Sequence, residues 1–401
     1  MKVKVTPSRA IGRVIAPPSK SMAHRALICG ALSRGSRITN LTFSKDIEAT
    51  VGCLKTLGAS VVVSGNTVDI GGFEPFNIPD EATLFCNESG STLRFMIPLC
   101  MLAGKKVTLT GSERLFERPL SVYEKIAAEQ GIQFEKTGNF LTVCGRLKSG
   151  TYSVSGAVSS QFITGLIFAL SCIDDKSEII VSDPFESASY VDLTLGALCD
   201  FGVDVKREGN TFRINGKRPE PREYEVEADY SNAAFLEGLN LLGGSVCVEG
   251  LSENTLQGDR VYKDIFEMLK KGICDYDLSD CPDLAPIAFA LAAALKGGKF
   301  TGTKRLKIKE SDRAEAMAQE LEKFGVGVTV AENSVTVEGG KLRTPTVELF
   351  GHNDHRIVMS LALLCSVTGG IIEGAQAVEK SYPDFFEKLR SLMVKIDEYE
   401  D

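Results

Sequence analysis

One string near the start of the sequence places cations where a helix is expected to begin. Residues 17–25 read PPSKSMAHR and put Lys20, Ser21 and Arg25 at the start of an apolar, helix-like run. Cations are normally disfavoured there, because the N-terminus of a helix already carries partial positive charge. An anion held jointly by the backbone N–H groups and these side chains would reverse that preference. The string therefore predicts a binding site for phosphate or carboxylate groups.

This helix start is the first of six similar segments. Each has a polar start, an apolar helix, a glycine-containing turn and a short strand. The six copies occupy residues 19–41, 89–111, 159–183, 229–251, 281–303 and 353–375. Hairpin patterns with a Gly-Asn or Glu-Asn turn lie between them, at residues 58–72, 131–146, 202–217 and 325–340. No such pattern follows Gly272, so we expect six α/β units of which the fourth is trimmed.

The repeat predicts an α/β (α+β) fold of two domains with three units each. Segment 215–229, NGKRPEPREYEVEAD, is rich in proline and charge and lies between two copies, so it is the expected domain boundary. Residues 1–16 precede the first unit and, judged on their own sequence, could pair with either half.

Composition narrows the class of protein. The net charge of −8 argues against a general nucleic-acid binder. The eleven cysteines form no C-x-x-C pair, and with three histidines and no paired acidic spacing we expect no metal site. The N-terminus has no apolar signal region, and the longest apolar runs fall short of the roughly 20 residues that span a bilayer. We therefore expect a cytoplasmic, soluble protein in a reducing compartment.

Residues able to bind anions or move protons gather at the other helix starts as well. They are Ser89, Gly90, Ser91, Arg94, Ser159, Ser160, Gln161, Asp229, Asp283, Asp354, His355 and Arg356. A single serine or aspartate there is most often only the N-cap of its helix. A cap has no use for a cation, however. If six related helices point their N-termini at one cleft, that cleft is suited to phosphates and carboxylates.

Three connecting strings carry further charges. SERLFERPL (112–120) is expected to be a proline-terminated loop with Arg114 and Arg118. LKIKESDRAEAM (306–317) surrounds a helix start with charges, which alone would be typical of a solvated helix end. Its charged residues of interest are Lys309, Glu310 and Arg313. VEKSYPDFFEKL (378–389) presents Lys380 before a final helix.

Taken in order, these strings resemble one family. They are PPSKSMAHR, ESGSTLRF, ERP at 117–119, SSQF, SASYVDLTL, PDLAP, IKESDR, NDHR and EKSYPDFFE. The sequence is similar, nearly end to end, to the EPSP synthase (3-phosphoshikimate 1-carboxyvinyltransferase) family of enolpyruvyl transferases. Each string is weak alone, whereas nine in the same order are specific.

The resemblance implies two domains, each a pseudo-threefold arrangement of small α/β units, with the active site in the cleft between them. Residues 17–227 would form the N-terminal domain on the shikimate 3-phosphate side. Residues 1–16 with 228–401 would form the C-terminal domain that completes the phosphoenolpyruvate site. The domains would close about hinges near residue 16 and in 215–229, and we expect a monomer because both halves lie in one chain.

The implied reaction moves the enolpyruvyl group of phosphoenolpyruvate onto the 5-hydroxyl of shikimate 3-phosphate and releases phosphate. It is an addition–elimination through a tetrahedral intermediate, in the shikimate pathway that leads to chorismate and aromatic amino acids, with no cofactor. Each substrate carries a phosphate and a carboxylate. Two unit charges at about 4 Å repel by roughly 4 kcal/mol at an effective dielectric of 20, so clustered Lys and Arg are needed to bring the substrates together.

Roles are carried over by motif. The residues implied to bind shikimate 3-phosphate are Lys20, Ser21, Arg25, Ser159, Ser160, Gln161, Ser187, Tyr190, Asp283 and Lys309. Those implied to bind phosphoenolpyruvate are Lys20, Gly90, Arg118, Gln161, Arg313, Arg356 and Lys380. The implied catalytic residues are Asp283, which takes the proton of the 5-hydroxyl, Glu310, which handles the proton at the methylene carbon, and Lys20.

Two residues depart from the family pattern, and two other functions stay open. Glu88 stands where the family commonly has Asn, and Arg305 stands where many relatives have Asn. One alternative is the sister enzyme that acts on UDP-N-acetylglucosamine, although the loop GSERLFERPLSV lacks the reactive cysteine of that enzyme. The other is a non-catalytic anion-binding module, which would be expected to have lost Asp283 or Glu310.

Overall fold

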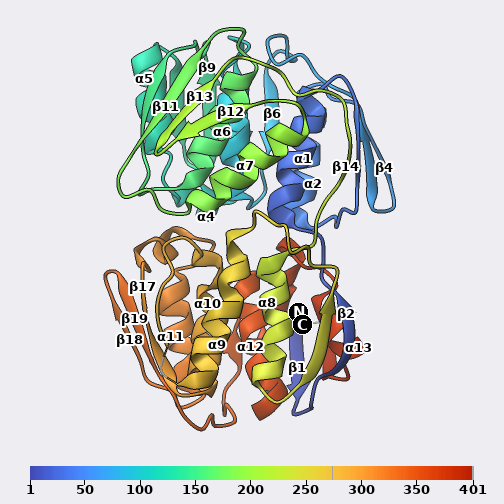
Figure 1. Cartoon of the computed structure of the whole chain (residues 1–401), viewed down its shortest axis with the longest axis vertical. Coiled ribbons are helices and arrows are strands. Elements are labelled where there is room, and N and C mark those ends of the chain that lie inside the picture. The colour runs from blue at the N-terminus through green and yellow to red at the C-terminus, as the bar shows by residue number, and fades with distance from the viewer. Residues whose placement is uncertain (273, 400–401) are drawn as a thin grey trace. The chain divides into compact units, whose positions relative to one another are not determined.

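The computed structural model describes residues 1–272 and 274–399 and contains two compact units. The N-terminal unit is Pro18–Glu227, and the C-terminal unit is Met1–Pro17 together with Ala228–Asp401. Each unit has its own hydrophobic core, and the two cores share no residue. Figure 1 shows the helices and strands of both units. No helix in the part of the chain described is long and apolar enough to cross a membrane.

The N-terminal unit contains three sheets of four strands, in the orders β14-β3-β5-β4, β6-β7-β9-β8 and β10-β11-β13-β12. Its strands are β3 (Ser36–Thr39), β4 (Val61–Ser64), β5 (Thr67–Ile70), β6 (Ala82–Phe85), β7 (Val107–Thr110), β8 (Gln133–Thr137), β9 (Phe140–Cys144), β10 (Thr151–Ser155), β11 (Ser177–Ser182), β12 (Val205–Glu208), β13 (Thr211–Ile214) and β14 (Glu223–Glu225). Its helices are α1 (Lys20–Leu32), α2 (Lys45–Thr56), α3 (Gly90–Cys100), α4 (Glu113–Glu117), α5 (Ser121–Gln130), α6 (Ser160–Ser171) and α7 (Ala188–Asp200).

The C-terminal unit contains sheets in the orders β16-β17-β19-β18, β20-β21-β1-β22 and β15-β2. Its strands are β1 (Lys2–Thr6), β2 (Ile11–Ile15), β15 (Ser245–Glu249), β16 (Cys274–Asp277), β17 (Gly297–Thr301), β18 (Val328–Ala331), β19 (Ser334–Glu338), β20 (Leu349–Phe350), β21 (Gly370–Glu373) and β22 (Lys395–Tyr399). Its helices are α8 (Tyr230–Leu241), α9 (Tyr262–Lys271), α10 (Ala285–Ala294), α11 (Arg313–Lys323), α12 (His355–Thr368) and α13 (Phe385–Ser391). Short 3-10 turns are η1 (Gly258–Val261), η2 (Pro282–Leu284), η3 (Lys304–Ile308) and η4 (Ala375–Lys380).

The five four-stranded sheets share one topology, which confirms the sequence repeat. In each sheet, the first two strands of the order are parallel, and the second and third, and the third and fourth, are antiparallel. All four predicted hairpins are present, as β4-β5, β8-β9, β12-β13 and β18-β19. Gly65, Gly138 and Gly209 begin three of the turns with φ near 60°, a left-handed conformation that glycine adopts without strain.

The fourth and sixth units depart from the standard unit. The fourth has only the parallel pair β15-β2, as expected from the hairpin missing after Gly272. In the sixth, β1 and β22 from opposite ends of the sequence take the two antiparallel places. The N-terminal strands β1 and β2 therefore both complete sheets of the C-terminal unit.

The helices whose starts carry the chemically capable residues are the buried helices of each unit. Nearly every residue of α1, α3 and α6 is buried, and so is nearly every residue of α10 and α12. A helix that is apolar all round must be enclosed by other elements. Five of the six predicted helix starts have an N-cap whose side chain accepts a backbone N–H, at Ser19, Ser89, Ser159, Asp229 and Asp354. The rigid core thus fixes where these helices begin.

Candidate active site

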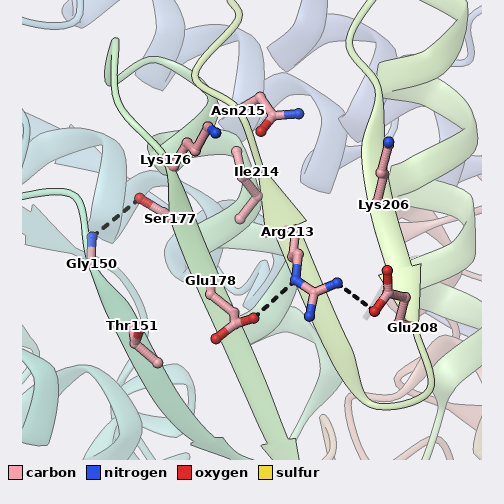
Figure 2. A pocket seen from close by; sticks show the side chains of 10 residues that line it. All are labelled: Gly150, Thr151, Lys176, Ser177, Glu178, Lys206, Glu208, Arg213, Ile214 and Asn215. Atoms are coloured by element: carbon pink, nitrogen blue, oxygen red, sulfur yellow. Dashed lines mark hydrogen bonds and ion pairs between the residues drawn. The ribbon is translucent and has the colours of Figure 1, made fainter.

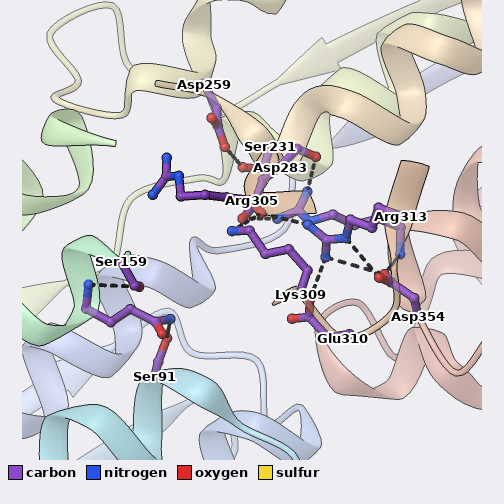
Figure 3. Close-up of polar contacts among 12 residues, drawn as sticks. Ser91, Ser159, Ser231, Asp259, Asp283, Arg305, Lys309, Glu310, Arg313 and Asp354 are labelled. Atoms are coloured by element: carbon purple, nitrogen blue, oxygen red, sulfur yellow. Dashed lines mark hydrogen bonds and ion pairs between the residues drawn. The ribbon is translucent and has the colours of Figure 1, made fainter. Parts of the chain in front are cut away.

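Three cations of the C-terminal unit converge on one carboxylate, that of Asp283 in η2. Asp283 Oδ1 accepts hydrogen bonds from Lys309 Nζ at 3.2 Å and from Arg313 Nη1 at 2.8 Å. Its Oδ2 accepts from Arg356 Nη2 at 2.9 Å. Figure 3 shows Lys309 and Arg313 approaching Asp283 from neighbouring elements. The sequence places these residues far apart, and the fold brings them into direct contact.

Burial and charge oppose each other at Asp283. Desolvation favours the neutral acid, but the charges of Arg356, Lys309 and Arg313 outweigh it and hold the pKa of Asp283 well below its usual range. Burial in turn lowers the pKa of Lys309, an effect that the Asp283 carboxylate partly offsets. Asp283 is therefore an ionised carboxylate with cation donors at both oxygens.

Arg313, at the first position of α11, is the hub of this cluster. Besides Asp283 it donates from Nη2 to Glu310 Oε2 at 2.8 Å and from Nε to Asp354 Oδ2 at 2.8 Å. Its side chain is about 1% exposed, and although burial disfavours its charge, Asp354, Glu310 and Asp283 raise its pKa. A planar guanidinium presents five N–H donors in a fixed fork, so one side chain can hold three carboxylates along defined directions. Arg313 thereby fixes both proposed proton-transfer groups, Asp283 and Glu310, with respect to each other.

Two further cations of the C-terminal unit lie beside this cluster. Lys380, at the end of η4, donates from Nζ to the Asn353 carbonyl at 2.5 Å, one residue before the N-cap of α12. Arg305, one of the two departures from the family pattern, is buried in η3 and donates to the Ser279 carbonyl at 2.7 Å. Lys380 is thus tied to the helix start that carries Arg356.

In the N-terminal unit, Arg25 fixes two of the predicted shikimate 3-phosphate ligands. It donates to the Ser21 carbonyl at 2.7 Å, to the Tyr190 carbonyl at 2.6 Å and to Thr194 Oγ1 at 2.9 Å. Burial lowers the pKa of Arg25 to about 10, so the guanidinium still carries its charge at neutral pH. Ser187, the N-cap of α7, has φ 56°, a strained backbone of the kind that clusters at functional sites.

The starts of α1, α2, α3 and α6 are joined by polar contacts. Lys20 Nζ forms an ion pair with Asp46 Oδ2 at 2.8 Å. The Gln161 side chain accepts from Arg94 Nη1 at 3.1 Å and donates to Ser91 Oγ at 3.0 Å. These contacts hold the side chains of Lys20 and Gln161 in place at their helix starts.

Gly90 and Arg118 lie in close contact. A Cβ added to Gly90 would come within 2.5 Å of Arg118 Nη1, so only glycine lets the guanidinium lie against the first turn of α3. Arg118 is about 8% exposed and follows α4 as its C-cap. The backbone N–H groups of a helix start and an arginine thus adjoin one another, an arrangement suited to an anion.

The structure corrects one expectation and adds residues that the sequence did not identify. SERLFERPL is not a plain loop: Glu113–Glu117 form the short helix α4, capped by Ser112. Arg114 on it is half-buried and pairs with Glu117 at 3.1 Å. Asp46 and Glu320 were not identified from the sequence, because nothing in their local sequence shows which distant cation or turn they contact. Arg94 and Asp354 were noted at helix starts, but their partners Gln161 and Arg313 were not predicted.

A surface hollow of about 500 Å³ lies apart from these helix starts, over the sheet β10-β11-β13-β12. Figure 2 shows Arg213 between Glu178 and Glu208, with which it forms ion pairs. All three side chains project from the solvent face of the strands. The arginine of this hollow is therefore already paired with two acids of the same sheet.

The repeated α/β fold and the charge clusters at its helix starts define a class: an α/β protein of repeated units whose helix starts are suited to small anions. Comparison with known proteins gives the family. The family model for EPSP synthase (3-phosphoshikimate 1-carboxyvinyltransferase) matches residues 5–389. This chain belongs to the EPSP synthase family.

Individual relatives agree with the family match. The chain is 41% identical to the 3-phosphoshikimate 1-carboxyvinyltransferase of Clostridium kluyveri over 99% of this chain and 98% of the relative. It is 38% identical to that of Clostridioides difficile, with the same coverage. A solved EPSP synthase of Acinetobacter baumannii has the same fold, with a TM-score of 0.79 at 22% identity over 100% of both chains.

The family match decides between the functions left open by the sequence. The reaction of the EPSP synthase family, and of this chain within it, transfers the enolpyruvyl group of phosphoenolpyruvate to shikimate 3-phosphate in the shikimate pathway. Neither UDP-N-acetylglucosamine nor a purely non-catalytic role fits that assignment.

Proposed function

We propose that the charge clusters of both units act on one pair of substrates. The residues assigned to shikimate 3-phosphate are Lys20, Ser21, Arg25, Ser159, Ser160, Gln161, Ser187, Tyr190, Asp283 and Lys309. Those assigned to phosphoenolpyruvate are Lys20, Gly90, Arg118, Gln161, Arg313, Arg356 and Lys380. The observation that carries the proposal is the convergence of Lys309, Arg313 and Arg356 on Asp283.

Asp283 is proposed as the base for the 5-hydroxyl of shikimate 3-phosphate. As that oxygen bonds to C2 of phosphoenolpyruvate, its proton passes to the carboxylate and the methylene carbon C3 gains a proton. In the second half, phosphate leaves C2 and C3 loses a proton, which restores the double bond. Glu310, held 2.8 Å from Arg313, is proposed to give and take the proton at C3.

The cations around Asp283 explain how a weak base could be activated. In the structure both of its oxygens accept from Lys and Arg donors, which keeps its proton affinity low. The phosphate and carboxylate of phosphoenolpyruvate would compete for Arg313 and Arg356. A cation that also binds phosphoenolpyruvate stabilises the ionised form of Asp283 less than one that binds Asp283 alone. The pKa of Asp283 therefore rises once both substrates, including the nucleophilic 5-hydroxyl, are bound.

We propose that the two units close on the substrates about hinges near residue 16 and in 215–229. Closure would exclude water from the tetrahedral intermediate. We further propose that the protein acts as a cytoplasmic monomer without a cofactor, consistent with its eleven cysteines, all of which are thiols. Gel filtration with light scattering tests the monomer.

The proposal is tested by phosphate release from phosphoenolpyruvate, with shikimate 3-phosphate in one reaction and UDP-N-acetylglucosamine in another. Release with the first acceptor only is expected, and NMR of the product should show the new ether at the 5-oxygen. Release with the second acceptor would overturn the substrate assignment. Tight anion binding without release in either reaction would favour a non-catalytic module.

A further inference from the structure

The backbone immediately before α12 has an unusual conformation. His352 and Asn353 are consecutive non-glycine residues with φ 49° and 50°, in the left-handed region. Such conformations cost free energy and persist only where the surroundings hold them in place. The next residues along the chain are Asp354, His355 and Arg356, so the strained turn determines where α12 begins.

Glu320, on α11, holds one side of this turn. Its carboxylate, on a side chain about 2% exposed, accepts from the Phe350 backbone N–H at 2.9 Å and from His352 Nε2 at 3.0 Å. Lys323 Nζ, one turn further along α11, also donates to it at 2.8 Å. Burial alone would raise the pKa of Glu320, but these hydrogen bonds outweigh it and lower that pKa. The carboxylate is thus ionised, with backbone and side-chain donors around it.

The other side of the turn reaches the cations of the site. The Asn353 carbonyl accepts from Lys380, and Asp354 both caps α12 and accepts from Arg313 Nε. Arg356 donates to Asp283 from the first turn of the same helix. A shift of the turn would therefore move Lys380, Arg313 and Arg356 together. Glu320 and His352 themselves contact none of the reacting groups.

We propose that Glu320 and His352 are positioning residues of the enzyme: by fixing the turn at residues 350–353, they set the geometry of the phosphoenolpyruvate-binding cations. This inference rests on the proposed function, in which Arg356 and Lys380 bind phosphoenolpyruvate. It assigns a role in substrate affinity to two residues that lie outside both proposed sets of substrate-binding residues.

The first test compares substitutions of His352. His352→Phe keeps an aromatic ring against Phe350, whose ring centroid lies 4.9 Å from that of His352, and removes the hydrogen bond to Glu320. We expect KM for phosphoenolpyruvate to rise about 10-fold while KM for shikimate 3-phosphate stays within about 2-fold. His352→Gln, which can still donate to Glu320, should restore most of the affinity. Glu322→Gln, an exposed change on α11, is the matched control.

An unchanged KM for phosphoenolpyruvate in His352→Phe would overturn the inference. So would equal losses in both KM values and in the amount of folded protein, because they would indicate a merely structural role. Arg356→Lys separates the inference from the proposed function beneath it. If Arg356→Lys raises KM for phosphoenolpyruvate and His352→Phe does not, the positioning role fails alone; if neither does, the proposed binding site fails.

A second readout does not depend on activity. Hydrogen exchange of Glu320→Gln, followed by mass spectrometry, should show faster exchange in peptides covering 350–358 than in the Glu322→Gln control, because the turn loses its charged acceptor. Equal exchange in the two variants would show that Glu320 does not hold the turn. That result would overturn the inference regardless of the kinetics.

Discussion

Asp283 is an anion held among three cations, and it is also the residue that we propose as the base. Asp283→Asn removes the charge and the proton acceptor but keeps the size of the side chain. We expect kcat to fall by about 10²–10⁴-fold, the usual contribution of a positioned base. Binding of shikimate 3-phosphate and phosphoenolpyruvate should be retained, because the substrates no longer compete with a carboxylate for Lys309, Arg313 and Arg356.

Steady-state kinetics and calorimetric binding of each substrate check this prediction. Asp280→Asn, three residues earlier in the sequence, is a control for a change of net charge. Turnover of Asp283→Asn at the parental rate would show that the base lies elsewhere.

Gly90 is a second residue where structure and binding are directly linked. In Gly90→Ala, the added methyl group would meet the Arg118 guanidinium at 2.5 Å. The far end of an arginine can move, so we expect little loss of stability. Its displacement should raise KM for phosphoenolpyruvate by roughly 10-fold, since about 1.4 kcal/mol of binding corresponds to each factor of ten.

The check on Gly90→Ala is a comparison of KM for both substrates with the midpoint of thermal unfolding. Gly131→Ala is an unsuitable control because Gly131 has φ 67°, whereas Gly52→Ala adds a methyl group in open space on α2. A fall in thermal stability with both KM values unchanged would contradict the role given to Arg118.

Some residues of the candidate site could be identified from the sequence alone, and others could not. Lys20, Arg25 and Arg356 were identifiable because an ordinary helix start has no use for a cation. Their partners were not, since Asp46 lies 26 residues from Lys20 and Asp283 lies 73 residues from Arg356. Which carboxylate pairs with which cationic side chain depends on how whole helices pack, and no local sequence pattern carries that information.

At the scale of elements, the sequence predicted what depends on local chemistry. Turn residues and period-two alternation were sufficient for the four hairpins, because both signals lie within one short segment. The completion of the last sheet by β1 and β22 was not predictable in this way. Those strands lie at opposite ends of the sequence. Their pairing depends on the edge of β21, which β1 joins, and then on the edge of β1, which β22 joins.

The buried contact between α1 and α2 makes a prediction about pH. His24 Nδ1 is hydrogen-bonded to Thr50 Oγ1 at 2.8 Å, and burial, followed by the charges of Lys20 and Arg25, holds its pKa well below the usual range. The folded state thus keeps the ring neutral, while the unfolded chain protonates it below about pH 6.5. The stabilisation from neutral His24 is full above that pH and is lost as the pH falls.

In His24→Asn this pH dependence should disappear. The variant is expected to be less stable than the parent at pH 7.5, and the gap should shrink by about 2 kcal/mol at pH 5, from about 1.4 kcal/mol per pH unit. Urea unfolding read by hydrogen exchange in α3 peptides reports on the N-terminal unit alone. A gap that is constant from pH 7.5 to 5 would mean that His24 titrates equally in both states.

At the scale of the whole molecule, two separate hydrophobic cores suggest two units of unfolding. The core of the C-terminal unit includes Val3 and Val5 of β1, although most of its residues follow position 228. Val5 is about 1% exposed and pairs with Gly370 of β21 and Ile396 of β22. The first strand of the sequence therefore stabilises a unit whose other elements, apart from β2, all follow residue 228.

Val5→Ala tests this arrangement. Loss of two buried methyl groups should lower the stability of the C-terminal unit by roughly 2 kcal/mol. The N-terminal unit should be unaffected, because no core residue is shared. Urea midpoints read separately in peptides of β21 and of β7 give the two stabilities, and Lys4→Ala, an exposed change in the same strand, is the control. Equal falls in both midpoints would show that the units unfold together, in which case a substitution in either core would weaken both halves of the substrate-binding machinery.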